Sequence, residues 1–525
     1  MRDFLTQVSY DAWVLPALLL IPLAGALLLL ITGSLSNDDG TVESAPSARV
    51  IALVVFVVEL VVSLGLWWSY DPAGPRWQAT FDHWWIIPWN ARLSMGIDGI
   101  SLMMVLLTTV IMPLAVLGSW TSIREKVRSY YALMLVLTTG MLGVFVARDM
   151  LFFYLMWEIM LIPMYFIIGI WGGERRVYAS IKFFIYTTAG SLLMLVGIVY
   201  LWTASAAPGS AASFDYDRML TIAHSHTAAL WLFAAFFLAF AVKTPMFPFH
   251  TWLPDAHTEA PTAGSVILAS LMLKMGTYGF IRFAIPLFPS AALTPWVRTT
   301  VLSLAVIGIL YGALVSMVQP DFKKLVAYSS VSHLGFVVLG IFALTQQSVQ
   351  GAMMVMINHG ISTGALFLLI GMIYERRHTR LIASYGGIAR VVPMFSALLV
   401  IVSFSSIGLP ATNGFVGEFL VLLGSYRTHP YFTLFATTAV ILAAAYLLWG
   451  IQGIIFNPLD KKENEHISDL NARELTVMGV LVAGIFWIGI YPQPILRRME
   501  ASSAYFVNSV EAAQTTIRTA ERGSR

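Results

Sequence analysis

Residues 243–279, KTPMFPFHTWLPDAHTEAPTAGSVILASLMLKMGTYG, decide the fold of this chain. Two lysines, Lys243 and Lys274, stand in apolar surroundings, and between them Pro245 and Pro248 remove backbone donors that a continuous helix needs. The stretch therefore predicts a broken helix followed by an apolar helix that contains a lysine. A charge at the centre of a membrane span costs about 2.5 to 3.5 kcal/mol on insertion scales, so both lysines are candidate functional residues.

The composition of the whole chain indicates that its main solvent is lipid. Of 525 residues, 58% are hydrophobic and 11% are charged, with a mean hydropathy of +0.77. A soluble domain carries about 25% charged residues. The chain has no cysteine, which excludes disulfides, thiolate zinc sites and iron–sulfur ligation by this chain. Its net charge of +3 is small and scattered, which argues against a nucleic-acid surface.

Apolar stretches of about 20 residues, the length that crosses a bilayer core, recur along the chain. The first, at 13–32, is longer than the apolar core of a signal peptide and is expected to be a membrane span. We expect an all-α, multi-pass membrane protein of about fourteen spans. Their approximate ranges are 13–32, 50–68, 97–117, 130–147, 151–169, 182–203, 228–249, 261–285, 296–317, 325–343, 352–374, 393–423, 431–456 and 475–491.

Lysine and arginine predict which side each loop faces, because cytoplasmic loops are enriched in them. Fifteen of them follow odd-numbered spans: Arg49, Arg124, Lys126, Arg128, Arg175, Arg176, Lys323, Lys324, Arg376, Arg377, Arg380, Arg390, Lys461, Lys462 and Arg473. Seven follow even-numbered spans: Arg76, Arg92, Arg148, Arg218, Arg282, Arg298 and Arg427. Both termini are therefore expected on the outer side of the membrane.

The C-terminal tail departs from this charge rule, since it carries Arg497, Arg498, Arg518, Arg522 and Arg525. It also spaces apolar residues at helical intervals, namely Phe506, Val510, Ala513 and Ile517. This spacing predicts a helix that lies along the membrane surface or against a neighbouring subunit. A solvated helical end is an equal alternative.

Two carboxylates also lie inside expected spans. Glu158 is nine residues into the fifth span, at a depth of about 13 Å, which is the midplane. Glu418 ends the run SSIGLPATNGFVGE, whose glycines and proline break the twelfth span. A static salt bridge between Glu158 and Lys243 is the plainer interpretation, but it leaves Lys274 and Glu418 unexplained. Four buried charges thus favour a path for ions, most simply protons.

Two histidines extend this series. His333 lies in the tenth span with Ser329 and Ser330 on its helical face, and His359 lies in the eleventh beside Asn358. A neutral imidazole both accepts and donates a proton, so either ring can act in a relay. Each can also be a hydrogen-bonded packing residue, and for His359 that alternative weighs as much as the relay.

The two interrupted spans, the seventh and the twelfth, are five spans apart, which is typical of transporters built from repeats. We expect repeats at 130–290 and 291–460, flanked by segments 1–129 and 461–525. Five helices per unit invert the second copy relative to the first. Lys243 then corresponds to Glu418 and Glu158 to His333, and the two half-channels open to opposite sides.

The run at 243–279, the run DFKKLVAYSSVSHLGF at 321–336 and the intrahelical Glu158 resemble the antiporter-like membrane subunits of respiratory complex I. Bacteria have three such subunits, called L, M and N, and the resemblance covers most of this chain. Glu418 favours the M type, because its relatives typically carry lysine at that place. Related chains occur in Mrp-type sodium/proton antiporters, which are the alternative assignment. A structural spacer without conduction is a third.

The resemblance implies a subunit of a proton-pumping NADH:quinone oxidoreductase in the bacterial plasma membrane. FMN, iron–sulfur clusters and quinone would belong to partner subunits, with subunits L and N as neighbours and no cofactor in this chain. Protons would pass from a switch formed by Glu158 and Lys243 to Lys274, then through His333 and His359 to an exit group, Glu418. Quinone reduction in the partners would supply the energy.

Overall fold

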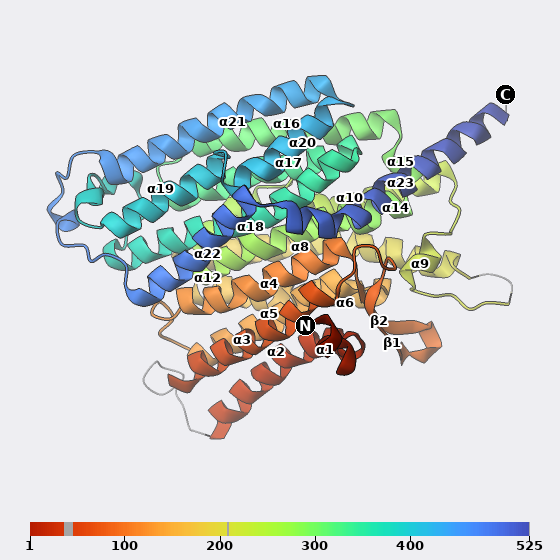
Figure 1. Ribbon diagram of the computed structural model, residues 1–525, viewed down its shortest axis with the longest axis horizontal. Coiled ribbons are helices and arrows are strands. Elements are labelled where there is room, and N and C mark those ends of the chain that lie inside the picture. Colours follow the sequence, from red (N-terminus) through yellow and green to blue (C-terminus); the bar gives the residue numbers. More distant parts are fainter. Residues whose placement is uncertain (36–45, 207–208, 524–525) are drawn as a thin grey trace.

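The computed structural model describes residues 1–35, 46–206 and 209–523, and its long helices lie side by side (Figure 1). Thirteen helical segments in the described part are long and apolar enough to cross a membrane. They are α2 (Tyr10–Leu35), α3 (Pro46–Ser69), α4 (Gly99–Gly118), α5 (Val127–Val146), α6 (Met150–Ile159) with α7 (Leu161–Trp171), α8 (Arg176–Ala204), α10 (His226–Lys243), the series from α12 (Thr262–Ile267) through α13 (Leu273–Gly279) to α14 (Ile285–Leu287), α16 (Pro295–Met317), α17 (Phe322–Ala343), α18 (Gln346–Arg377), α21 (Pro430–Ile451) and α22 (Ala472–Ile490).

The twelfth expected span is present in two shorter pieces, α19 (Pro393–Ile407) and α20 (Asn413–Tyr426). Gly408 ends α19 with φ +83°, a left-handed conformation that glycine adopts without steric cost. Each of the fourteen expected spans therefore has its helix, and the expectation of an all-α membrane fold is confirmed.

Helices at the centre of the bundle are buried on every side. In the most apolar stretch of α12–α14 and of α18, 100% of the residues are buried, whereas in α3 and α22 the share is 33%. The outer helices therefore present apolar side chains outward, as a membrane-embedded protein requires. The candidate residues of the eighth, tenth and eleventh spans lie on this central set of helices.

Several short elements outside the spans have no counterpart in the expectations. They are α1 (Arg2–Gln7), the antiparallel strands β1 (Gln78–Ile86) and β2 (Ala91–Ile97), α9 (Tyr216–Met219), α11 (Trp252–Glu259) and α15 (Pro289–Ala292). In Figure 1 the hairpin and α9 lie at the same end of the bundle as α23 (Gln493–Gly523). That end is where the even-numbered spans finish.

The C-terminal helix α23 packs against its own chain, on α4 and α18, a contact that the expectations for the tail did not include. Met499, Phe506 and Val510 are buried in this contact, and the backbone N–H of Gly99 donates to Ser502 Oγ at 2.8 Å. The prediction of a helix from the spacing of apolar residues is thus correct, but the first half of this helix is covered by helices of the same chain. The side chain of Ile517 lies outside the described part.

Candidate functional site

Lys243 is the last residue of α10, directly before the first break. Its side chain is buried, and its ammonium lies 5.5 Å from the ring centroids of both Trp157 and Phe183. The ammonium has no hydrogen-bond partner among the described residues. Two aromatic faces therefore provide its nearest stabilisation, through cation–π attraction.

Glu158 lies on α6, one residue after the tryptophan that faces Lys243, and is half-buried. Its carboxyl lies beside the hydroxyls of Tyr154 and Ser191, and one of its oxygens has no hydrogen-bond partner in the described part. The described residues contain no ion pair between Glu158 and Lys243. The two charges are close enough to interact electrostatically, but they are separated in this structure.

Lys274 is fully buried in α13, between two π-helical turns at Leu268–Met272 and Phe280–Ala284. Such turns occur frequently at functional sites. The Lys274 ammonium donates to the carbonyl of Ala269, in the first of these turns, and lies 2.6 Å from His359 Nδ1. The lysine therefore has a direct route for a proton into an imidazole ring.

The two histidines continue from Lys274 to Glu418. The rings of His359 and His333 have centroids 5.7 Å apart, and His333 Nδ1 lies 2.8 Å from Glu418 Oε1. Lys274, His359, His333 and Glu418 thus form a line across α13, α18, α17 and α20. The sequence-based order is corrected here, because His359 contacts Lys274 and His333 contacts Glu418.

A small polar cavity of about 20 Å³ lies beside this line, which is room for about one water molecule. Among the described residues, His359 Nε2, Asn358 Oδ1 and Ser406 Oγ have no hydrogen-bond partner, and their residues line the cavity together with His333 and Glu418. The break in the twelfth span supplies part of the lining, since Gly414 and Glu418 begin α20. A water here has the polar partners that buried waters require.

His257 is a buried titratable residue that the sequence analysis did not select. It lies on α11, stacks on Phe367 at 4.8 Å between centroids, and neither ring nitrogen has a partner among the described residues. Lys274 and Lys323 lie within electrostatic range of its ring. The sequence feature that could have indicated this residue is its place in the run LPDAH, directly after the break in the seventh span.

Lys323, which the sequence analysis counted as a loop residue, is buried in the first turn of α17. It donates to the carbonyls of Ala260 at 2.6 Å and Thr258 at 3.3 Å, at the end of α11. Together with Glu259 and Arg380 it lines a cavity of about 410 Å³. This cavity lies where odd-numbered spans end, so the expected orientation assigns it to the cytoplasmic side.

Glu59 is a further buried titratable residue that was not among those predicted from sequence, and it lies near the middle of α3. Its side chain is fully buried, and neither carboxyl oxygen has a partner in the described part of the chain. It does not touch the line from Lys274 to Glu418, because α3 packs on α2, α4 and α5. The apolar residues around it in the sequence were the available signal.

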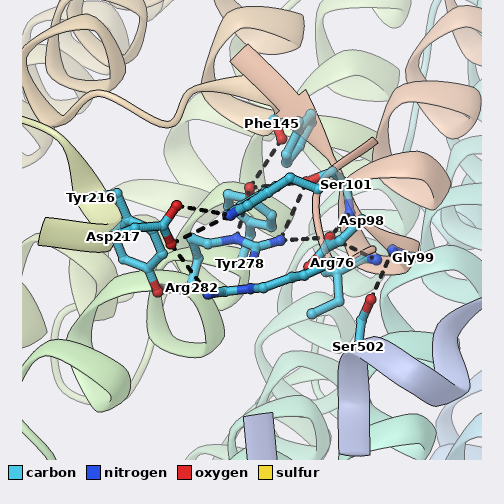
Figure 2. Close-up of polar contacts among 12 residues, drawn as sticks. Arg76, Asp98, Gly99, Ser101, Phe145, Tyr216, Asp217, Tyr278, Arg282 and Ser502 are labelled. Carbon is cyan, nitrogen blue, oxygen red and sulfur yellow. Dashed lines mark hydrogen bonds and ion pairs between the residues drawn. The ribbon is translucent and has the colours of Figure 1, made fainter. Parts of the chain in front are cut away.

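Arg282 was expected in an outer loop, but it lies buried in the second π turn of the eighth span. Its guanidinium forms an ion pair with Asp98 at 2.6 Å and donates to the Tyr278 hydroxyl at 3.1 Å (Figure 2). The polar contacts continue outward to Arg76 and Asp217. Local sequence could not reveal this pairing, because its partners are 184 residues apart.

Residues 147–443 match the family described as the transmembrane part of NADH:quinone oxidoreductase and Mrp antiporters. The chain is 44% identical over 515 residues to NADH-quinone oxidoreductase subunit M of Rhodobacter capsulatus, covering 96% of this chain and 98% of the relative. It is 41% identical over 517 residues to subunit M of Pseudomonas aeruginosa, covering 96% and 99%.

Two solved structures share the fold. A chain of respiratory complex I from Thermus thermophilus matches with a TM-score of 0.84 and 31% identity, covering 95% of this chain and 99% of that one. A chain of the Mrp complex from Dietzia matches with a TM-score of 0.77, but at 19% identity and over 56% of its length. The first likeness extends to sequence and length, and the second to the fold alone.

Proposed function

This chain belongs to the family of NADH-quinone oxidoreductase M subunits, the antiporter-like membrane subunits of complex I, and we propose that its buried charged line is a path for protons. The observation that carries the proposal is the contact from Lys274 through His359 and His333 to Glu418. As a complex I subunit, the chain serves proton translocation that is coupled to quinone reduction in its partners.

Lys274 and His359 make the first step of the path. The ammonium donates a proton to Nδ1 of the neutral ring across 2.6 Å, and the ring releases the proton on Nε2, which faces the 20 Å³ cavity. One water in that cavity accepts from Nε2 and passes a proton towards His333 and Glu418. Each transfer moves one proton. Lys274 is then neutral and takes up a new proton from the cytoplasmic side, and His359, left with its hydrogen on Nδ1, returns to the Nε2 tautomer before it accepts again.

Glu158 and Lys243 act as the switch in this proposal. A carboxylate close to the ammonium raises the proton affinity of Lys243, and its withdrawal lowers that affinity. The separated arrangement described above corresponds to the state that releases a proton. His257 and the cavity beside Lys323 supply the connection from the cytoplasmic side to Lys274.

The chain's place in the cell completes the proposal. We assign it to a bacterial plasma membrane with both termini outside, beside the L and N subunits. FMN, iron–sulfur clusters and quinone bind to partner chains. Two inverted repeats, 130–290 and 291–460, supply the half-channels, and the breaks after Lys243 and before Glu418 support this division.

The test is Lys274→Ala in the assembled complex. We expect proton pumping to be lost and quinone reductase activity to fall strongly, because the relay loses its first donor. Lys462→Ala removes an exposed lysine from a loop and serves as the control. Proton uptake by proteoliposomes during NADH oxidation measures the effect. Pumping at the unaltered level with intact assembly would refute the path.

An Mrp-type antiporter is the competing function, since the shared fold offers the same breaks and buried charges. The 44% and 41% identities to M subunits outweigh the 19% identity to the Mrp chain. Purification with native partners separates the two functions. Flavin and iron–sulfur subunits in the complex support the complex I assignment, and their absence from a functional complex contradicts it.

A further inference from the structure

We propose that Asp98 is a positioning residue for the proton step at Lys274. It neutralises the positive charge of Arg282, which lies on the same membrane span as Lys274. This inference rests on the proposed role of Lys274. It concerns residues outside the line from Lys274 to Glu418, and it assigns a functional reason to the ion pair at the outer end of the eighth span.

The helix itself connects Lys274 to the ion pair. Tyr278 and Arg282 follow Lys274 at intervals of four residues, so the Arg282 backbone lies about 12 Å along the helix from Lys274. All three side chains are buried. The Tyr278 hydroxyl accepts from Arg282 Nε at 3.1 Å and donates to the Phe145 carbonyl at 3.0 Å, which fixes the guanidinium (Figure 2).

Asp98 holds its negative charge by local structure as well as by Arg282. It is the N-cap of α4 and accepts from the backbone N–H groups of Ile100 at 3.1 Å and Ser101 at 3.0 Å. Burial on its own raises the pKa of Asp98, but Arg282 and these backbone donors outweigh burial and hold the pKa below its usual value. Loss of Arg282 removes the two largest interactions that favour the carboxylate, so in that variant its charge depends on the N-cap donors and is fullest on the alkaline side of the pH profile.

The charged side chains next to this pair sum to one positive charge, because two arginines share one carboxylate. Arg76 and Arg148 both pair with Asp217, at 3.3 and 2.9 Å, and the Tyr216 hydroxyl donates to the Arg282 carbonyl. Tyr70 also faces Asp98. Lys274 itself faces His359 and His257, on α18 and α11. Removing one member of the Asp98–Arg282 pair thus changes the net charge near Lys274 by one unit.

The size of the effect follows from Coulomb's law. With the backbone separation of about 12 Å taken as the distance between the charges and an effective dielectric constant of about 20, one unit charge changes the proton-binding constant of Lys274 about tenfold, or about one pH unit. Asp98→Asn leaves Arg282 uncompensated, and repulsion makes Lys274 release its proton at lower pH. Arg282→Gln leaves Asp98 uncompensated, and attraction keeps the proton on Lys274 to higher pH.

The experiment measures proton pumping against pH in proteoliposomes that contain the complete complex. We expect the alkaline limb of the profile to move down by about one unit for Asp98→Asn and up by about one unit for Arg282→Gln. Arg282→Lys keeps the charge and should leave the alkaline limb in place. The double variant Asp98→Asn/Arg282→Gln should return the limb to the position it has in the unaltered complex. If the ion pair were merely structural, both single variants would pump fewer protons, and their pH profiles would not shift in opposite directions.

Two outcomes overturn the inference without touching the proposed path. Both single variants could shift the limb in the same direction, or neither could shift it, while Lys274→Ala still abolishes pumping. If Lys274→Ala itself retains pumping, the proposed path fails first. Should the buried single variants not assemble, Asp217→Asn at the exposed end should shift the limb downward at low salt by a smaller amount, and no shift there contradicts the inference.

Discussion

Glu59 illustrates at the residue scale why burial must be considered together with hydrogen bonding. An ionised carboxylate without partners is very costly in an apolar interior, whereas the neutral acid costs a few kcal/mol at most. Both oxygens of Glu59 lack partners in the described part of the chain, and no described residue forms an ion pair with it. We therefore expect this acid to keep its proton during turnover.

The corresponding prediction is that Glu59→Gln assembles and pumps like the unaltered chain, because glutamine has the same shape and no charge. Glu59→Lys should prevent assembly, since it buries an unpaired charge at a cost of about 2.5 to 3.5 kcal/mol on insertion scales. Native gel electrophoresis and proton uptake measure the two results. Lost pumping by the Gln variant in an intact complex would mean that Glu59 changes its ionisation state.

Single residues in the candidate site were readable from sequence because lipid makes each charge costly. Glu158, Lys243, Lys274 and Glu418 stand out for this reason alone. The order of the histidines was not readable, since both contacts, Lys274 with His359 and His333 with Glu418, join residues 85 positions apart. Which helices face each other depends on packing across the bundle, and no local pattern records it.

At the scale of elements, the breaks were predictable and the hairpin was not. Pro245 and Gly408 interrupt their helices by local chemistry, so their effect can be read from the residues themselves. The strands at 78–97 lack a regular apolar alternation, because register shifts occur at Gln78/Phe81 and Trp84/Ile86. The burial of α23 depends on its contacts with α4 and α18, which the sequence of a single helix cannot reveal.

Gly276 allows α13 and α10, the helices that carry Lys274 and Lys243, to pack closely against each other. A Cβ there would lie 2.6 Å from the Phe240 carbonyl oxygen and 2.7 Å from the Thr244 backbone nitrogen, so backbone would have to move. We predict that Gly276→Ala lowers the stability by about 1–3 kcal/mol, as overpacking does, and reduces pumping.

Gly479 on α22 is the matched control, because a Cβ there meets no atom within 4 Å. Gly479→Ala should be neutral or slightly stabilising, since alanine favours helix over glycine by about 1 kcal/mol. Thermal unfolding of the purified complex compares the two variants. Equal melting curves and equal pumping for both would show that the α10–α13 approach is not critical.

At the scale of the whole molecule, the uneven placement of arginine and lysine gives the chain a direction in the membrane. The arginines and lysines after odd-numbered spans outnumber those after even-numbered spans, and removing the buried residues Arg282 and Lys323 from the two counts leaves that difference unchanged. At the other end, Arg76 and Arg148 share one carboxylate, Asp217, which neutralises one of their two charges. On the charge rule we therefore expect the end that carries the hairpin and α23 to be the outer one.

The absence of cysteine from the sequence makes this direction measurable without background labelling of the chain. Ser210→Cys, exposed in the loop after α8, should react from outside with a membrane-impermeant maleimide in intact cells. Ser468→Cys, exposed in the loop before α22, should react only after the membrane is opened. Mass spectrometry of this chain reads the label. The reverse pattern would place both termini in the cytoplasm, would exchange the two half-channels, and would make Glu418 the group that takes up protons.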